Sequence, residues 1–184
     1  TQIVDADPGS RREVPFVLNA GGLRVVIKAI GGIAKDTARY DVFSDERDQA
    51  GARLRVITNA RPGLITRLNS GIYHIVSRLG DANALVSAEV AVEAGKLTEA
   101  VVCHEAAKVS FKLVTTVAGE ALAETLWIIM TKTGDIIEET AGALPTHVLA
   151  PGTYNVSARR AGQNYSRSFA VRSGENVEVE VLMR

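Results

Sequence analysis

The side chains that could carry out chemistry in this 184-residue chain are few and far apart. Histidine occurs at His74, His104 and His147, and Cys103 is the only cysteine. No two histidines have the spacing of a metal-binding motif such as HExxH, and no GxSxG element surrounds a serine. An enzyme needs acids, bases and nucleophiles that meet in one place. The sequence therefore favours a protein that is not an enzyme and has no cofactor and no metal. A hydrolase that uses His74 or His147 is the alternative, and it requires these side chains to meet acids in space.

Three aromatic residues are the strongest candidates for a ligand surface. Trp127, Tyr40 and Tyr165 could form a stacking platform for a sugar, because exposed aromatic rings hold carbohydrate in many binding modules. The chain has only one Trp, four Tyr and four Phe, so a hydrophobic core would need most of them. The acidic stretches DADPG at 5–9 and SDERD at 44–48 lack the DxDxDG spacing of a calcium loop. They favour solvated turns, with calcium-stabilised turns as an alternative.

The overall composition indicates a folded globular chain. Hydrophobic residues make up 46% and charged residues 23%, and the formal net charge is zero. Because there is no basic surplus, we expect no nucleic-acid partner. No apolar run approaches the roughly 18 residues of a membrane span, so we expect no membrane insertion of this segment. The opening TQIVDADPG, without Met, suggests an excised segment or a mature form.

An internal repeat organises the chain. Placing Gly71-Ile-Tyr73 on Gly152-Thr-Tyr154 aligns Leu68 with Leu149, and VAVEAG at 90–95 then aligns with FAVRSG at 169–174. In this alignment Cys103 takes the place of Leu182, so we expect an inert, half-buried thiol. His74 alternates with the apolar residues on either side of it and should point outward. An internal repeat takes precedence over local sequence patterns, because equivalent segments of a repeat adopt the same fold.

The repeat overrides the local helix signal. The stretch VSAEVAVEAGKLTEAVVCHEAAKVSFKLV is rich in Ala, Glu, Lys and Leu, and alone it would predict a long helix. Its counterpart SRSFAVRSGENVEVEVLM alternates apolar and polar residues, as a half-buried strand does. Equivalent segments should share one structure, so we predict strands in both.

The repeats also set the expected domains. We predict terminal strands of a preceding repeat in 1–19, which we expect to pack on the first domain, one β-sandwich in 20–105 and a second in 106–184. Each copy contains about seven short strands separated by turn signals. The fold class is therefore all-β, with two tandem Greek-key β-sandwich domains of about seven strands each.

The spelling L-x-P-G-x-Y-x-V resembles the carboxypeptidase regulatory-like, or transthyretin (prealbumin)-like, group of sandwich domains, and the collagen-adhesin B-type repeats share it. The residues that carry the resemblance are Leu149, Pro151, Gly152, Tyr154 and Val156, with Leu68, Gly71, Tyr73 and Ile75 in the earlier copy. The first copy departs from the pattern at Ser70, which stands in place of the proline. The opening VLNAGGLRV also resembles tandem domains in secreted or envelope proteins of Gram-negative bacteria.

The resemblance implies a function. Such domains usually act as a spacer, a folding aid or a binding surface, and rarely as a catalyst. We therefore expect a non-catalytic, extracytoplasmic module of a larger bacterial protein, with further domains in the same chain. It would act as a structural spacer or protein-interaction surface, and a carbohydrate-binding accessory module is the alternative. The partner is then an unknown protein or polysaccharide.

Overall fold

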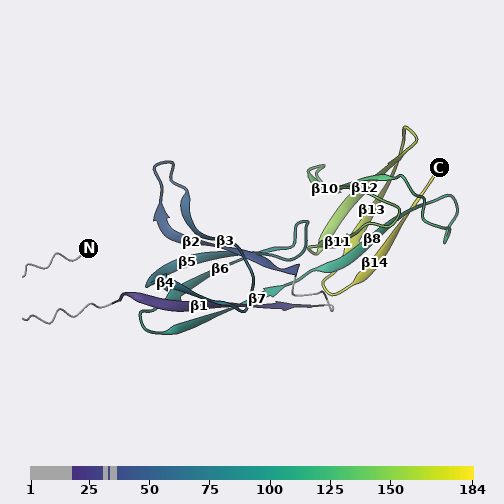
Figure 1. The fold of residues 1–184 in the computed structure, drawn as a ribbon. Helices are drawn as coiled ribbons and strands as arrows, with labels where there is room; N and C mark the ends of the chain where they lie inside the picture. The colour runs from purple at the N-terminus through teal and green to yellow at the C-terminus, as the bar shows by residue number, and fades with distance from the viewer. Residues whose placement is uncertain (1–17, 31–32, 34–36) are drawn as a thin grey trace, which may run out of the picture.

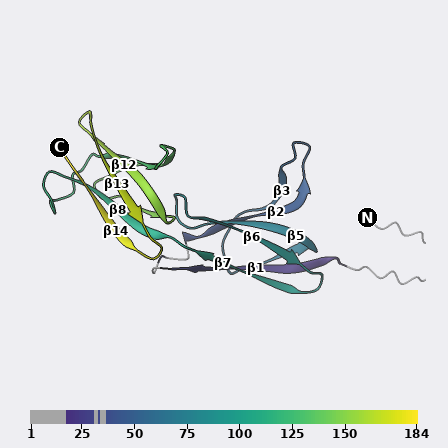
Figure 2. The same ribbon diagram turned by 180° about the vertical axis from the view of Figure 1, so that it is seen from behind.

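The computed structural model describes residues 18–30, 33 and 37–184. Within them the chain forms fourteen β-strands arranged as four sheets. The sheets make two sandwich units that follow one another along the molecule (Figures 1 and 2). The all-β prediction of two tandem sandwiches with about seven strands each is therefore confirmed. No helix in the described part of the chain is long and apolar enough to cross a bilayer.

The first seven strands form the first repeat. Their order in the two facing sheets is β4-β1-β7 and β3-β2-β5-β6. All neighbouring strands are antiparallel except β1 and β7, which run parallel. The bounds are β1 Ala20–Ala29, β2 Arg39–Arg47, β3 Arg53–Ala60, β4 Ile65–Asn69, β5 Gly71–Arg78, β6 Leu85–Val92 and β7 Leu97–His104.

The remaining seven strands form the second repeat with the same topology. The sheet orders are β11-β8-β14 and β10-β9-β12-β13, and β8 and β14 are the parallel pair. The two copies are therefore the same building block. The bounds are β8 Ala107–Val114, β9 Leu126–Thr131, β10 Ile136–Ala141, β11 Thr146–Leu149, β12 Gly152–Arg160, β13 Gln163–Val171 and β14 Asn176–Leu182.

The segment with helical composition is made of strands, as the repeat predicts. Residues 87–115 contain most of β6 and all of β7 and β8. In β14, Val179 and Val181 are buried whereas Glu178 is exposed, so the period-two alternation gives the two faces of the strand. Burial of one face in a sandwich outweighs the weak helix propensity of Ala, Glu and Lys.

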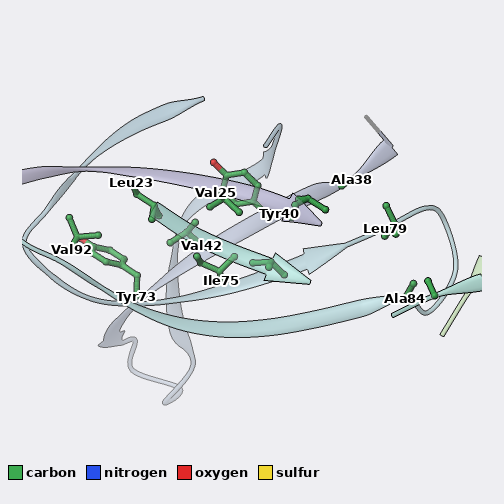
Figure 3. Packing of buried hydrophobic residues seen from close by; sticks show 14 residues of the cluster. Leu23, Val25, Ala38, Tyr40, Val42, Tyr73, Ile75, Leu79, Ala84 and Val92 are labelled. Atoms are coloured by element: carbon green, nitrogen blue, oxygen red, sulfur yellow. The ribbon is translucent and has the colours of Figure 1, made fainter. Parts of the chain in front are cut away.

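Each repeat has its own hydrophobic core. The first core includes Leu23, Val42, Tyr73 and Ile75, and Figure 3 shows Tyr40 among these side chains between the two sheets. The second core is built around large side chains at equivalent places. Its largest buried members are Phe111, Leu113, Trp127, Ile129, Leu149 and Tyr154.

The predicted boundary near residue 105 falls between two strands. β7 ends at His104 and β8 begins at Ala107, so two residues join the repeats. Ala106 belongs to the first core and Ala107 to the second. The covalent link between the repeats is therefore short, and neighbouring residues at its end are buried in the two different cores. The DADPG stretch and residues 1–17 of the predicted earlier repeat, 1–19, lie outside the described residues.

Candidate functional site

The loop that joins β5 to β6, residues 79–84, makes polar contacts with the second repeat. We call it the junction loop. Its base is closed by the Leu79 N–H, which donates to the Ala84 carbonyl at 2.9 Å. The side chains of these two residues are buried. Gly80 has φ +76°, a left-handed conformation that glycine adopts at little cost. The loop is therefore anchored in the first core while its middle faces the second repeat.

A closed ring of hydrogen bonds joins the junction loop to the turn before β12. The Ala150 N–H donates to Oδ1 of Asn83 at 3.1 Å, and Nδ2 of Asn83 donates to the Tyr154 hydroxyl at 3.0 Å. The Tyr154 hydroxyl in turn donates to the Ala150 carbonyl at 2.7 Å. Each of these partly buried groups has a partner, which makes the arrangement favourable and directional.

Apolar contacts cross the junction in both directions. Ala82 of the first repeat packs against the second core, and Val148 of the second repeat packs against the first core. A Cβ placed at Gly80 would lie 2.8 Å from the Cβ of Val148, so only glycine allows this close approach. Each repeat therefore contributes a side chain that packs against the core of the other.

A histidine adds a charged contact to the same interface. His147, on β11, is 5% exposed, and its Nδ1–H donates to Oδ2 of Asp81 in the junction loop at 3.0 Å. A carboxylate can only accept, so the proton lies on the ring nitrogen. The other face of this histidine is near Phe111, with ring centroids 6.4 Å apart. His147 therefore has a structural position between the repeats.

His104 lies beside the junction loop at the end of β7. It is 1% exposed, and a 2.8 Å hydrogen bond joins its Nε2 to Oγ of Ser77. Burial lowers the pKa of His104. The folded protein therefore favours the neutral imidazole.

We expect His104 to make folding sensitive to mild acid. Because its pKa is lower in the folded state than in the unfolded state, the unfolded chain binds the proton more readily. The free energy of unfolding should then fall as the pH drops below the unfolded pKa of about 6.5. Urea unfolding between pH 7.5 and 5 should show a smaller pH dependence for His104→Met than for the wild type. Equal dependence in both proteins would contradict this role of His104.

The aromatic platform expected from the sequence is not formed. Trp127 is 0% and Tyr40 2% exposed, and they lie in different cores. Nε1 of Trp127 donates to the Gly142 carbonyl at 2.8 Å. Tyr165 packs at the edge of the second core, and its hydroxyl donates to Gln163. The reason is structural equivalence, because Trp127 and Tyr40 fill the same position in the two sandwiches.

The register of the strands shows this equivalence. Val42 pairs with Ile75 in the first repeat and Ile129 pairs with Val156 in the second. Ile75 and Val156 are equivalent, so the residues two places earlier, Tyr40 and Trp127, are equivalent as well. Trp127 therefore aligns with Tyr40 and not with its neighbour Asp41.

The remaining sequence candidates are scattered. His74 lies on the outer side of β5 with a side chain 18% exposed, and its ring nitrogens are 3.4 Å from Asp45 and 3.5 Å from Glu89. It therefore shares no partner with His147. Cys103 is exposed, which corrects the expectation of a half-buried thiol, because it lies on the outward face of β7.

The SDERD stretch forms part of β2 and its turn. There Oδ1 of Asp48 accepts from the backbone N–H groups of Ala50 and Ala52, both at 2.9 Å. The carboxylate stabilises the turn of the hairpin. In the described ranges no three His, Cys, Asp or Glu side chains gather in an arrangement that could hold a metal ion.

The residues named in the resemblance lie at corresponding places. Tyr73 and Tyr154 are 7% and 4% exposed, and each hydroxyl donates to the carbonyl four residues earlier, in Asn69 and Ala150. Leu149 is fully buried, and Leu68 is partly buried against the first core. Pro151 is exposed in the turn before β12, and Gly152 and Gly71 are exposed as the first residues of the two tyrosine strands.

Comparison with known proteins gives a family likeness for the second repeat. Residues 108–183 match the model of the Rhizobiales growth-associated tandem repeat domain. The match covers less than half of the chain. It agrees with the repeated sandwich seen in the structure. A search of curated proteins finds no match.

Several solved structures are distantly similar. The Bacillus anthracis TIE protein has 15% identity and a TM-score of 0.36, over 89% of this chain and 34% of its own. A Streptococcal ancillary pilin has 15% identity and a TM-score of 0.40, over 90% and 63%. A putative cell adhesion protein from Bacteroides ovatus has 10% identity and a TM-score of 0.39, over 86% and 91%. The chain thus spans about a third of the length of the TIE protein.

Proposed function

We propose that this chain is a non-catalytic pair of β-sandwich repeats that acts as a structural spacer or protein-interaction module in a larger extracytoplasmic bacterial protein. Kinship with the carboxypeptidase regulatory-like or transthyretin-like domains is part of the same proposal. The match of residues 108–183 to a tandem repeat domain supports a module that occurs in several successive copies. The partner would be a protein that meets a surface of defined shape and not a small substrate.

The junction carries this proposal. A spacer must transmit a fixed geometry from one domain to the next, whereas a long flexible linker would lose it. Here two residues link β7 to β8, and the ring of hydrogen bonds through Asn83 fixes the direction of the second repeat. The close packing of Gly80 against Val148 opposes sliding of one repeat along the other. The pair should therefore move as one semi-rigid body.

The sugar-binding alternative loses its main support. It rested on an exposed platform of three aromatic side chains, and Trp127 and Tyr40 are core residues. Because both side chains are buried, they stabilise the two cores and are not accessible to a ligand.

The test measures the coupling between the repeats in the intact chain. Asn83→Ala removes both side-chain hydrogen bonds of the ring, and Tyr154→Phe removes the hydroxyl that it contacts. We expect each change to lower the free energy of unfolding by about 1–2 kcal/mol and the double variant to lose less than the sum. Residual dipolar couplings should also show that Asn83→Ala loosens the orientation of the two repeats.

The chain supplies a matched control. Tyr73→Phe removes the same local hydrogen bond in the first repeat, whereas the Asn83 side chain bonds to Tyr154 and Ala150. Its effect should add to that of Asn83→Ala without coupling. If Asn83→Ala and Tyr154→Phe were also additive, and if the orientation were unchanged, the fixed junction and the spacer function would both be wrong.

A further inference from the structure

The first repeat carries a second copy of the surface that receives the junction loop. We call residues 150–154 the second tyrosine turn and residues 69–73 the first tyrosine turn. In both, the tyrosine hydroxyl donates to the carbonyl four residues earlier, at 2.7 and 2.9 Å. In the second turn the tyrosine oxygen also accepts from Asn83. In the first turn no side chain of the described residues donates to Tyr73.

The backbone of the first tyrosine turn is oriented in the same way. The Ser70 N–H donates to the Asn19 carbonyl, on the side of β1. Successive N–H groups along an extended strand point to opposite sides, so the N–H of Asn69 points away from β1. Asn69 is the equivalent of Ala150, whose N–H donates to Asn83 across the junction. The first turn therefore presents the same donor and acceptor as the second.

Two apolar side chains in or beside this turn are exposed. Leu18, next to the Asn19 that contacts Ser70, is 83% exposed, and Ile72 is 48% exposed. Gly22 and Lys108 are equivalent, because they pair with the equivalent residues Leu97 and Asn176. Leu18 therefore takes the place of His104, which is 1% exposed beside the junction loop. A side chain that is buried at one junction is thus exposed at the equivalent place.

The geometry points to a docking surface. We propose that the first tyrosine turn, with Leu18, receives the junction loop of another repeat of the first-repeat type, through an Asn side chain that bridges the Asn69 N–H and the Tyr73 hydroxyl. This rests on the proposed function and names a partner for the first tyrosine turn. Thr66 stands in the place of His147, the partner of Asp81, so the bridging Asn side chain is the polar contact that the two surfaces share.

The partner must carry the longer loop. The second repeat has no such loop, because β12 and β13 are joined by a tight turn with Arg160 paired to Gln163. Positive φ angles at Ala161 and Gly162 make this a two-residue hairpin turn. A repeat of the second type would therefore leave the Asn69 N–H and the Tyr73 hydroxyl without a bridging partner.

The experiment extends the intact chain on its N-terminal side. In one chain, residues 1–17 are exchanged for a copy of residues 20–103, so that the retained Leu18 takes the place of His104 in the copy. In the control chain, they are exchanged for residues 106–182, so that Leu18 takes the place of Met183. Both described repeats stay complete in each chain. Hydrogen exchange of the Asn69 amide and the effect of Tyr73→Phe are measured in both.

The expected result distinguishes the two added copies. With the first-type copy, exchange of the Asn69 amide should slow about tenfold, and Asn83→Ala in that copy should couple to Tyr73→Phe by about fivefold in the unfolding equilibrium constant. The second-type copy should give neither effect. Unchanged exchange and additive substitutions with the first-type copy would overturn the docking proposal. If Asn83 and Tyr154 still couple in the original chain, the spacer function stands and only the docking proposal is lost.

Discussion

Trp127→Ala should destabilise the second repeat more than any other single truncation of a side chain in it, by about 3–5 kcal/mol. Trp127 is fully buried, its ring centroid is 5.7 Å from that of Phe111, and its indole N–H donates to the Gly142 carbonyl. Removing it leaves a cavity between the sheets and an unpaired carbonyl. The cavity and the unpaired carbonyl together account for the expected decrease in the free energy of unfolding.

Urea unfolding followed by far-ultraviolet circular dichroism measures this loss. Fluorescence is unsuitable because Trp127 is the only tryptophan. Leu126→Ala is the matched control, since this neighbouring side chain is 51% exposed and its truncation should change the free energy of unfolding by less than about 0.5 kcal/mol. Similar effects of the two substitutions would show that Trp127 is not the centre of the second core.

Gly80→Ala should cost about 2–4 kcal/mol and disturb the orientation of the repeats. Its φ of +76° contributes about 1 kcal/mol, because a Cβ is unfavourable in the left-handed region. The new Cβ would lie 2.8 Å from the Cβ of Val148, and overpacking of this kind costs about 1–3 kcal/mol. Urea unfolding gives the loss of stability, and residual dipolar couplings report the changed orientation.

Gly95→Ala separates the two contributions. Gly95 has φ +72°, but a Cβ there would meet nothing within 4 Å. Its substitution should cost only the backbone term of about 1 kcal/mol and leave the orientation unchanged. If Gly80→Ala cost no more than Gly95→Ala, the close approach of the repeats would contribute nothing to stability.

The strands could be predicted because the sequence contains two copies of one pattern. Residues 87–115 have helical composition, and only their alignment with the alternating valines of β14 identifies them as strands. Propensity acts on single residues, whereas the equivalent position in a repeat reports the tertiary environment. The fold class was therefore within reach of the sequence.

The facing of Trp127 was harder to predict. In the sequence its neighbours Leu126 and Ile128 are as apolar as it is, so alternation does not identify the inner face of β9. A register error of one residue moves every side chain to the other face of a sheet. The pairing of Ile129 with Val156 settles the register in the structure.

The junction was the part that the sequence could not reveal. Asp81 and Asn83 lie in a GDAN stretch that predicts a simple turn, and the only signal of a special role is that this loop is two residues longer than its counterpart. Their partners, His147 and Tyr154, are more than sixty residues away in the chain. Contacts of this kind depend on how two folded units meet, which periodicity within one unit does not encode.

The parallel pairing of β1 with β7 and of β8 with β14 determines how the molecule responds to a pulling force. The chain enters the first repeat through β1 and leaves it through β7, and the two strands pair from Gly22 with Leu97 to Ala29 with His104. Tension along the chain pulls such strands past each other, so their hydrogen bonds bear the load together and do not open one after another. The same arrangement recurs from Asn176 with Lys108 to Leu182 with Val114. Each repeat thus places a shear-loaded pair of strands directly in the path of the force.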